Sequence, residues 1–215
     1  ATIIMHNGAN TGGVFGHIFD FSSMPVVGKA LFALVACIIL TTVFSSIAGF
    51  FMAKYKMHPF ISTMANMLVI FGLITYATKG VSFGAIEPTI PSMIIPKVGT
   101  FPTIILWAIA AIIIVWFIWN KTTFGKNLYA VGGNAEAASV SGISVFAVTV
   151  GAFVLAGILY GFGSWLECLR MVGSGSAAYG QGWEMDAIAA CVVGGVSFTG
   201  GIGKISGVII GVAVF

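Results

Sequence analysis

Long apolar runs separated by short polar links organise this chain of 215 residues. Four of the runs are long enough to cross a bilayer, which takes ~20 helical residues. Pro59 can begin the second of them, because the N–H that proline lacks has no partner in the first turn of any helix. The pattern predicts four membrane-spanning helices, at Val26–Ala53, Phe60–Thr78, Phe101–Trp119 and Phe146–Leu166.

Polar segments lie before and between these runs. His6–Pro25 is rich in glycine and predicts a loop. Lys79–Thr100 contains Pro88, Pro91 and Pro96, and this excludes a continuous helix there.

The pattern changes after the fourth predicted helix. Asp186 begins an apolar run that reaches only to Val196, about half the thickness of a membrane. The glycine-rich stretch 193–203 ends this run, and a further apolar run begins at Ile205. The sequence therefore predicts a broken or re-entrant helix near the C-terminal third, a form found at membrane depth where the backbone lines water or is covered by protein. The candidate pathway residues are Asp186, Gly194, Gly195, Gly200 and Gly201.

Asn120–Val145 is the longest weakly apolar stretch between two strongly apolar runs, and it predicts a small helix at Ala135–Ser141. The Asn134 side chain can accept from the unpaired N–H groups of the first turn. Glu136 suits the positive end of the helix dipole, and Gly142 can end the helix in the left-handed conformation. A short capped helix with almost no apolar face is suited to docking into another protein. The candidate docking residues are Asn134, Glu136, Ala137, Ala138 and Gly142.

Composition excludes a soluble domain. Hydrophobic residues make up 59% of the chain and charged residues 7%, whereas roughly a quarter of a soluble domain is charged. The net charge of +3 is too small and scattered to indicate nucleic-acid binding. The predicted class is an all-α polytopic membrane protein. Ala1 is not an initiator methionine and Phe215 lies inside an apolar run, so we expect a fragment of a larger helical bundle, truncated at both ends.

The charged residues near the predicted broken helix have two interpretations. A carboxylate at the bilayer centre costs ~2.5–3.5 kcal/mol on insertion scales, so each charge lies near the surface or faces a polar cavity. We favour the surface for Glu167, Arg170 and Glu184, while Asp186 could cap the short helix or line a pathway.

Glycines recur at every fourth position in two stretches, which allows two helix backbones to approach closely. Packing inside one bundle is favoured over a dimer interface. The residues concerned are Gly157, Gly161, Gly203, Gly207 and Gly211.

Catalytic and metal-binding motifs do not fit. Gly200–Ser206 partly resembles a phosphate-binding loop. That motif requires Gly at the place of Phe198 and Ser or Thr at the place of Ile205, so it is not present. The histidines form no hydrolase arrangement, and the three cysteines have no metal-like spacing. We expect no enzyme activity, metal site or cofactor in this chain.

Three spaced motifs resemble one family. Gly-Gly-Asn-Ala-Glu-Ala-Ala within Asn120–Val145, the run Asp186–Gly203, and His58–Met64 are similar to segments of bacterial ABC sugar-importer permeases of the ribose/galactose class. The resemblance covers essentially the whole chain, and Ala189–Phe198 is most similar to galactose-transporting members. In contrast to many other importer permeases, no proline follows Gly142, so the docking geometry of those classes does not carry over.

The resemblance implies one transmembrane permease domain over residues 1–215, in the bacterial plasma (inner) membrane, importing simple sugars of the galactose, methyl-galactoside and glucose class. It implies three partners: an ABC ATPase subunit that holds ATP and Mg, a periplasmic or lipid-anchored sugar-binding protein, and a second permease copy. Lysines and arginines divide equally between the two sides, so the orientation also comes from the resemblance. It places residues 54–58 and 120–145 in the cytoplasm and turns segments 6–25, 79–100 and 170–185 towards the binding protein.

Three alternatives stay open. The chain could import ribose or another pentose. An ion-coupled secondary transporter would depend on a buried acid, with Asp186 as the candidate, and would not need ATP. A membrane scaffold or receptor would bind a partner without moving solute.

Overall fold

The computed structural model describes residues 25–80, 86, 89–98, 101–171, 175–176 and 178–214. The predicted loop at 6–25 lies outside these residues apart from Pro25, and so do parts of 79–100 and 170–185. The chain divides into two compact units, Ala1–Trp107 with Phe153–Tyr179, and Ala108–Ala152 with Gly180–Phe215.

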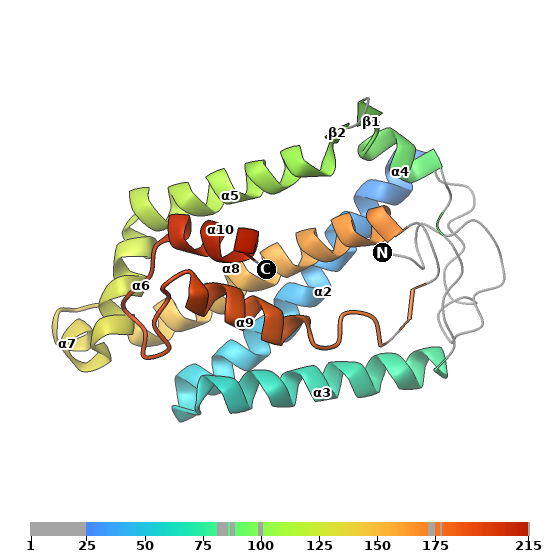
Figure 1. The fold of residues 1–215 in the computed structure, drawn as a ribbon. Helices are drawn as coiled ribbons and strands as arrows, with labels where there is room; N and C mark the ends of the chain where they lie inside the picture. Colours follow the sequence, from blue (N-terminus) through green and yellow to red (C-terminus); the bar gives the residue numbers. More distant parts are fainter. Residues whose placement is uncertain are drawn as a thin grey trace. The chain divides into compact units, whose positions relative to one another are not determined.

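Four helices are long and apolar enough to cross a membrane, which confirms the predicted polytopic α-helical class (Figure 1). They are α2 (Val26–Tyr55), α3 (Pro59–Thr78), α5 (Ile104–Lys121) and α8 (Val145–Met171). Pro59 is the first residue of α3, as expected for a proline at a helix start.

Two of the predicted bounds of these four helices were wrong by three or more residues, and the others lie within two residues of the observed helix ends. We expected the third span to begin at Phe101, but α5 begins at Ile104. A residue before proline avoids the helical region, so Phe101 is extended, and Phe101–Pro102 (β2) pairs antiparallel with Lys97–Val98 (β1). The fourth span was expected to end at Leu166, but α8 continues to Met171.

In the first unit, α8 packs against α2 through glycines. A methyl group built on Gly161 would lie 2.5 Å from the Cα atom of Ile38. Two hydroxyl groups of α2 also donate across the contact, from Thr41 to the Gly157 carbonyl at 2.8 Å and from Ser45 to the Phe153 carbonyl at 2.7 Å. Gly157 and Gly161 thus contact a helix of their own chain.

An apolar core joins these two helices to the short α4 (Thr89–Ile94). Trp165 is buried in it and its indole N–H donates to the Ala30 carbonyl at 3.1 Å. Trp107, in the first turn of α5, stands edge-on to Trp165 with ring centroids 6.4 Å apart. The buried members of this core are Ala30, Ala33, Ile86, Ile90, Trp165, Leu166 and Leu169.

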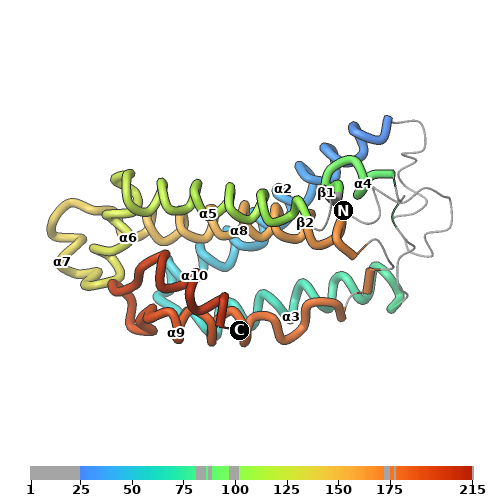
Figure 2. Tube along the Cα trace, turned by 45° about the horizontal axis from the view of Figure 1, so that its top comes forward, coloured from blue at the N-terminus to red at the C-terminus, as the bar shows by residue number. Residues whose placement is uncertain are grey.

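The second unit holds four further helices, together with α5 from Ala108 onwards and the start of α8. They are α6 (Thr123–Gly133), α7 (Ala135–Val140), α9 (Trp183–Val193) and α10 (Ile205–Val214). In Figures 1 and 2, α9 and α10 run back along each other as a hairpin, and the turn between them lies beside α6.

Candidate functional site

The predicted small helix is present as α7, and its ends have the expected geometry. The Asn134 side-chain oxygen accepts from the N–H groups of Glu136 and Ala137, each at 3.0 Å. At the other end Gly142 has φ +81°. Its N–H donates to the Ser139 carbonyl at 3.0 Å. An Asn cap contributes about 1 kcal/mol to a helix, which matters for a helix of only six residues.

The outer side of α7 is exposed. Glu136 and Ala137 are exposed, and Val140 is 91% exposed, whereas Ala138 is buried against the rest of the second unit. Among the described residues, α7 therefore presents one carboxylate and one isolated apolar side chain on a surface that is otherwise alanine and serine. The role of this surface in docking stays a prediction.

The segment contains a second helix, α6, which the sequence analysis missed. Thr122 caps it by accepting from the Gly125 N–H at 3.3 Å. The missed signal was the spacing of Phe124, Leu128 and Val131, three apolar residues on one helical face, all half-buried. The region is therefore two helices in series rather than a loop with one helix.

The C-terminal end of α6 lies directly on the turn between α9 and α10. The Tyr129 hydroxyl donates to the Gly203 carbonyl at 2.7 Å. A methyl group on Gly132 would lie 2.7 Å from the Gly201 backbone nitrogen, and one on Gly200 would lie 2.7 Å from the Gly132 carbonyl oxygen. We call this contact the α6 glycine junction; it consists of Tyr129, Gly132, Gly200, Gly201 and Gly203. Sequence reasoning singled out the three later glycines but not their partners on α6.

The predicted short apolar helix followed by a glycine-rich break is the α9–α10 hairpin. α9 has 11 residues and spans about 16 Å, roughly half the ~30 Å hydrocarbon core. A methyl group on Gly207 would overlap the Gly194 carbonyl oxygen, and one on Gly211 would overlap the Ala190 carbonyl oxygen. The two helix backbones are thus in direct contact, and both glycines face α9.

Gly203 differs from these two residues. The nearest atoms to a methyl group there belong to the Val196 side chain, the first of them at 3.3 Å. Gly195 has φ +80° directly after α9, in the turn that reverses the chain. The candidate pathway glycines therefore lie at the hairpin turn and between its helices, and their contact with solute stays a prediction.

Asp186 does not cap α9, so that expected role was wrong. The helix begins three residues earlier, at Trp183, with Gly182 at the cap position in the left-handed conformation. The Glu184 carboxylate accepts from the Gly182 N–H at 3.1 Å instead. Asp186 is exposed in the first turn.

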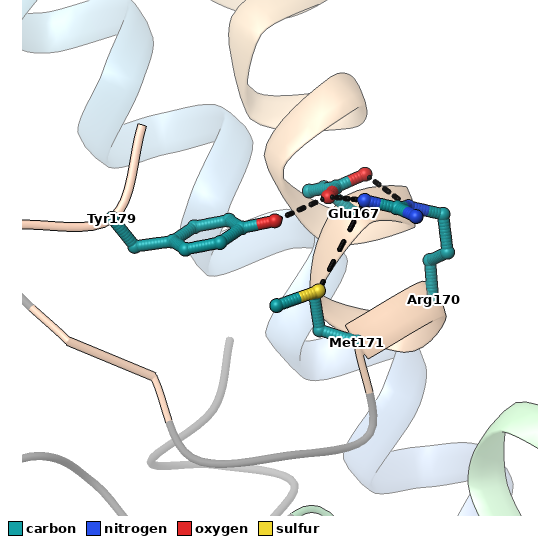
Figure 3. A network of polar contacts seen from close by, with 4 residues as sticks. All are labelled: Glu167, Arg170, Met171 and Tyr179. Carbon is teal, nitrogen blue, oxygen red and sulfur yellow. Dashed lines mark hydrogen bonds and ion pairs between the residues drawn. The ribbon is translucent and has the colours of Figure 1, made fainter. Parts of the chain in front are cut away.

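A second polar cluster lies at the end of α8 in the first unit (Figure 3). Arg170 donates two hydrogen bonds to the Glu167 carboxylate, one of them from Nε at 2.8 Å, and the Tyr179 hydroxyl donates to the same carboxylate at 2.7 Å. Arg170 and Tyr179 are exposed and Glu167 is half-buried. The position of Glu167 and Arg170 near the membrane surface stays a prediction. This cluster explains why α8 continues past Leu166, because residues three apart on a helix can pair along its side.

Tyr179 provides a pH-dependent test of this cluster. Its hydrogen bond to the Glu167 carboxylate raises the pKa of the Tyr179 phenol above the usual value. Because the folded-state pKa is the higher one, the stabilisation is fully present below pH ~10 and is lost as the pH rises through the folded-state pKa. Ultraviolet titration of tyrosine should show a late-ionising phenol that disappears in Tyr179→Phe and moves to lower pH in Glu167→Gln. The same titration midpoint in Glu167→Gln and the wild type would contradict the assignment.

A metal site requires several ligand side chains grouped together. Within the residues that the structure describes, no three His, Cys, Asp or Glu side chains are grouped so as to hold a metal ion. Each described acidic side chain is at least partly exposed.

Apolar spanning helices, a capped helical segment between two of them and a half-length helix in a backbone-packed hairpin are features of a multi-pass membrane protein. The chain belongs to the family described as branched-chain amino acid transport system / permease component, whose model matches residues 3–215.

Three relatives indicate where in this family the chain lies. It is 47% identical to the galactose/methyl galactoside import permease protein of Treponema pallidum, over 99% of this chain and 42% of that protein. It is 40% identical to the protein of the same name from Escherichia coli, over 91% of this chain and 59% of that protein. It is 37% identical to the L-arabinose transport system permease protein of Escherichia coli, over 77% of this chain and 50% of that protein.

The chain spans about half the length of the curated relatives it matches. No solved structure matches it. The predicted resemblance to sugar-importer permeases of the ribose/galactose class is confirmed by these relatives.

Proposed function

We propose that the protein is the transmembrane permease subunit of an ATP-driven importer for simple sugars of the galactose and methyl galactoside class. The observation that carries the proposal is α7, a capped helix with an exposed outer side between two spanning helices. It lies in a chain that is 47% and 40% identical to two galactose/methyl galactoside import permeases. The family description mentions branched-chain amino acids, but the relatives compared above are named for sugars.

In this proposal residues 1–215 are part of one permease domain in the bacterial inner membrane. Residues 54–58 and 120–145 lie on the cytoplasmic side. A partner ATPase holds ATP and Mg, a sugar-binding protein delivers the solute, and a second permease copy completes the pathway.

The proposed mechanism is a packing switch. ATP-driven closure of the ATPase pair moves α7, and the permease changes between inward-facing and outward-facing states. Glu136 meets a cationic or donor group of the ATPase, because its carboxylate is the exposed charge on α7. A neutral sugar needs only a transient polar passage, and the chain has few charges in its spanning helices.

The test measures ATP hydrolysis and sugar uptake by the full-length permease reconstituted with its ATPase and binding protein. Galactose-loaded binding protein should stimulate hydrolysis, whereas arabinose or ribose should give a weaker response. If only a pentose stimulated ATP hydrolysis, the proposed substrate would be that pentose rather than galactose. Uptake driven by an ion gradient without ATP would support the secondary transporter, and absence of any flux would support a scaffold or receptor.

Gly142→Val should uncouple sugar uptake from ATP hydrolysis. Valine disfavours the left-handed conformation by about 1–2 kcal/mol, so the end of α7 would change its path. Gly142→Asn is the matched control, because asparagine tolerates that conformation and should keep most of the uptake. Unchanged uptake in Gly142→Val would remove α7 from the coupling mechanism while leaving the importer intact.

A further inference from the structure

We propose that the α6 glycine junction transmits the movement of α7 to the α9–α10 hairpin, with Tyr129 and Gly132 as the positioning residues for coupling. This inference rests on the proposed importer function and adds to it the route by which a docking event reaches the broken helix. Every contact on the route lies within the second unit.

The first step joins α7 to α6 without a flexible linker. Asn134 is the only residue between the two helices. Its backbone N–H donates to the Ala130 carbonyl of α6 at 3.0 Å, while its side chain caps α7. One residue is thus fixed to both helices, so a displacement of α7 also displaces the end of α6.

The second step crosses from α6 to the turn of the hairpin. Gly132 meets Gly200 and Gly201 backbone to backbone, at distances that leave no room for a methyl group. The nearest atoms at these three glycines are backbone atoms, which cannot rotate to absorb a displacement. Tyr129 adds a hydrogen bond to the Gly203 carbonyl, which ties the other side of the same turn to α6.

The third step is the turn itself, which is held by its own hydrogen bonds. The Ser197 N–H donates to the Ile202 carbonyl at 3.0 Å, and the Val196 N–H donates to the Cys191 carbonyl of α9, also at 3.0 Å. The hydroxyl groups of Ser197 and Thr199 are hydrogen-bonded at 2.8 Å. Since α9 and α10 then touch along their backbones, the turn and both helices are expected to move together.

Static packing is the competing explanation of the same contacts. A contact that only stabilises the fold would change the amount of assembled permease, and hydrolysis and uptake would fall together. A contact that transmits movement changes the number of sugar molecules imported per ATP. The ratio therefore distinguishes the two, because coupling must be measured rather than read from adjacency.

The experiment uses the full-length permease with its ATPase and galactose-loaded binding protein in proteoliposomes. Gly132→Ala should lower sugar imported per ATP about tenfold, because the new methyl group separates α6 from the turn. Gly133→Ala is the matched control, since it is the next residue of α6 and a methyl group there meets nothing within 4 Å. Its ratio should stay within about twofold of the wild type, because the Gly133 backbone lies beside Gly201 but the added methyl group would point into open space.

Tyr129→Phe is the second variant, and it removes only the hydroxyl group that bonds Gly203. Loss of this hydrogen bond should lower the ratio about fivefold. If Gly132→Ala fails to assemble, the ratio measured for Tyr129→Phe tests whether the junction transmits movement.

Three outcomes would overturn the junction: an unchanged ratio in Tyr129→Phe, an unchanged ratio in assembled Gly132→Ala, or an equal fall in Gly133→Ala. Absence of sugar-dependent hydrolysis in the wild type would instead overturn the proposed function.

Discussion

Replacing Gly161 with alanine is expected to lower the free energy of unfolding of the full-length permease by about 1–3 kcal/mol, the usual range for an added group in a packed contact. The methyl group would lie 2.5 Å from the Ile38 Cα atom and 2.6 Å from the Thr41 hydroxyl oxygen. A backbone atom cannot rotate away, so α8 and α2 would have to separate. Separation would also weaken the hydrogen bond from Thr41 to the Gly157 carbonyl.

Gly163→Ala provides the control for this prediction. Gly163 lies two residues further along α8, and a methyl group there meets nothing within 4 Å. Alanine is the better helix former by up to about 1 kcal/mol, so this variant should be as stable as the wild type or slightly more stable. Denaturant titration of both variants in mixed micelles measures the difference. Equal unfolding free energies for the two would show that α2 and α8 do not pack through Gly161.

The four spanning helices could be predicted from the sequence because each is strongly apolar over nearly its whole length. Hydropathy alone indicates such helices, whatever their neighbours are. The errors fell at the ends. α5 begins after Pro102, where the local backbone preference of Phe101 outweighs its hydrophobicity. α8 continues to Met171, where the pair of Glu167 and Arg170 allows charged residues in the last turn.

α6 was harder to predict because short helices depend on tertiary contacts. A helix of 11 residues is marginal by itself in water, and its pattern resembles that of a polar link. The cap at Asn134 could be predicted since it depends only on the backbone N–H groups two and three residues further along the chain. The start of α9 could not, because Gly182 rather than a side-chain cap precedes it, and Glu184 accepts from the backbone there.

The glycine pairs show a further limit of sequence reasoning. The spacing of Gly207 and Gly211 predicts a close backbone contact, but nothing in the sequence names Gly194 and Ala190 as its partners. In the same way, Gly132 has no local signal that distinguishes it from Gly133. Only the folded chain shows that a methyl group on Gly132 would meet the turn, whereas one on Gly133 would point into open space.

An added methyl group between α9 and α10 is also expected to have a large effect. Gly207→Ala should lower the free energy of unfolding by about 3 kcal/mol, the upper end of the range for overpacking, because the new methyl group overlaps the Gly194 carbonyl oxygen. Sugar uptake should be lost as well, since α9 and α10 could no longer remain in backbone contact. Denaturant titration and uptake by the same purified preparation measure the two effects.

Gly203→Ala is the graded comparison within the same hairpin. Its methyl group would lie 3.3 Å from a Val196 methyl carbon, and a side chain can shift by the few tenths of an ångström required. The cost should stay below about 1 kcal/mol, because the contact of Gly203 with α6 uses its carbonyl oxygen, which the substitution keeps. If the two variants were equally stable, α9 and α10 would not be held by direct backbone contact. If Gly207→Ala alone were destabilised but still imported sugar, the hairpin would be a structural element rather than part of the pathway.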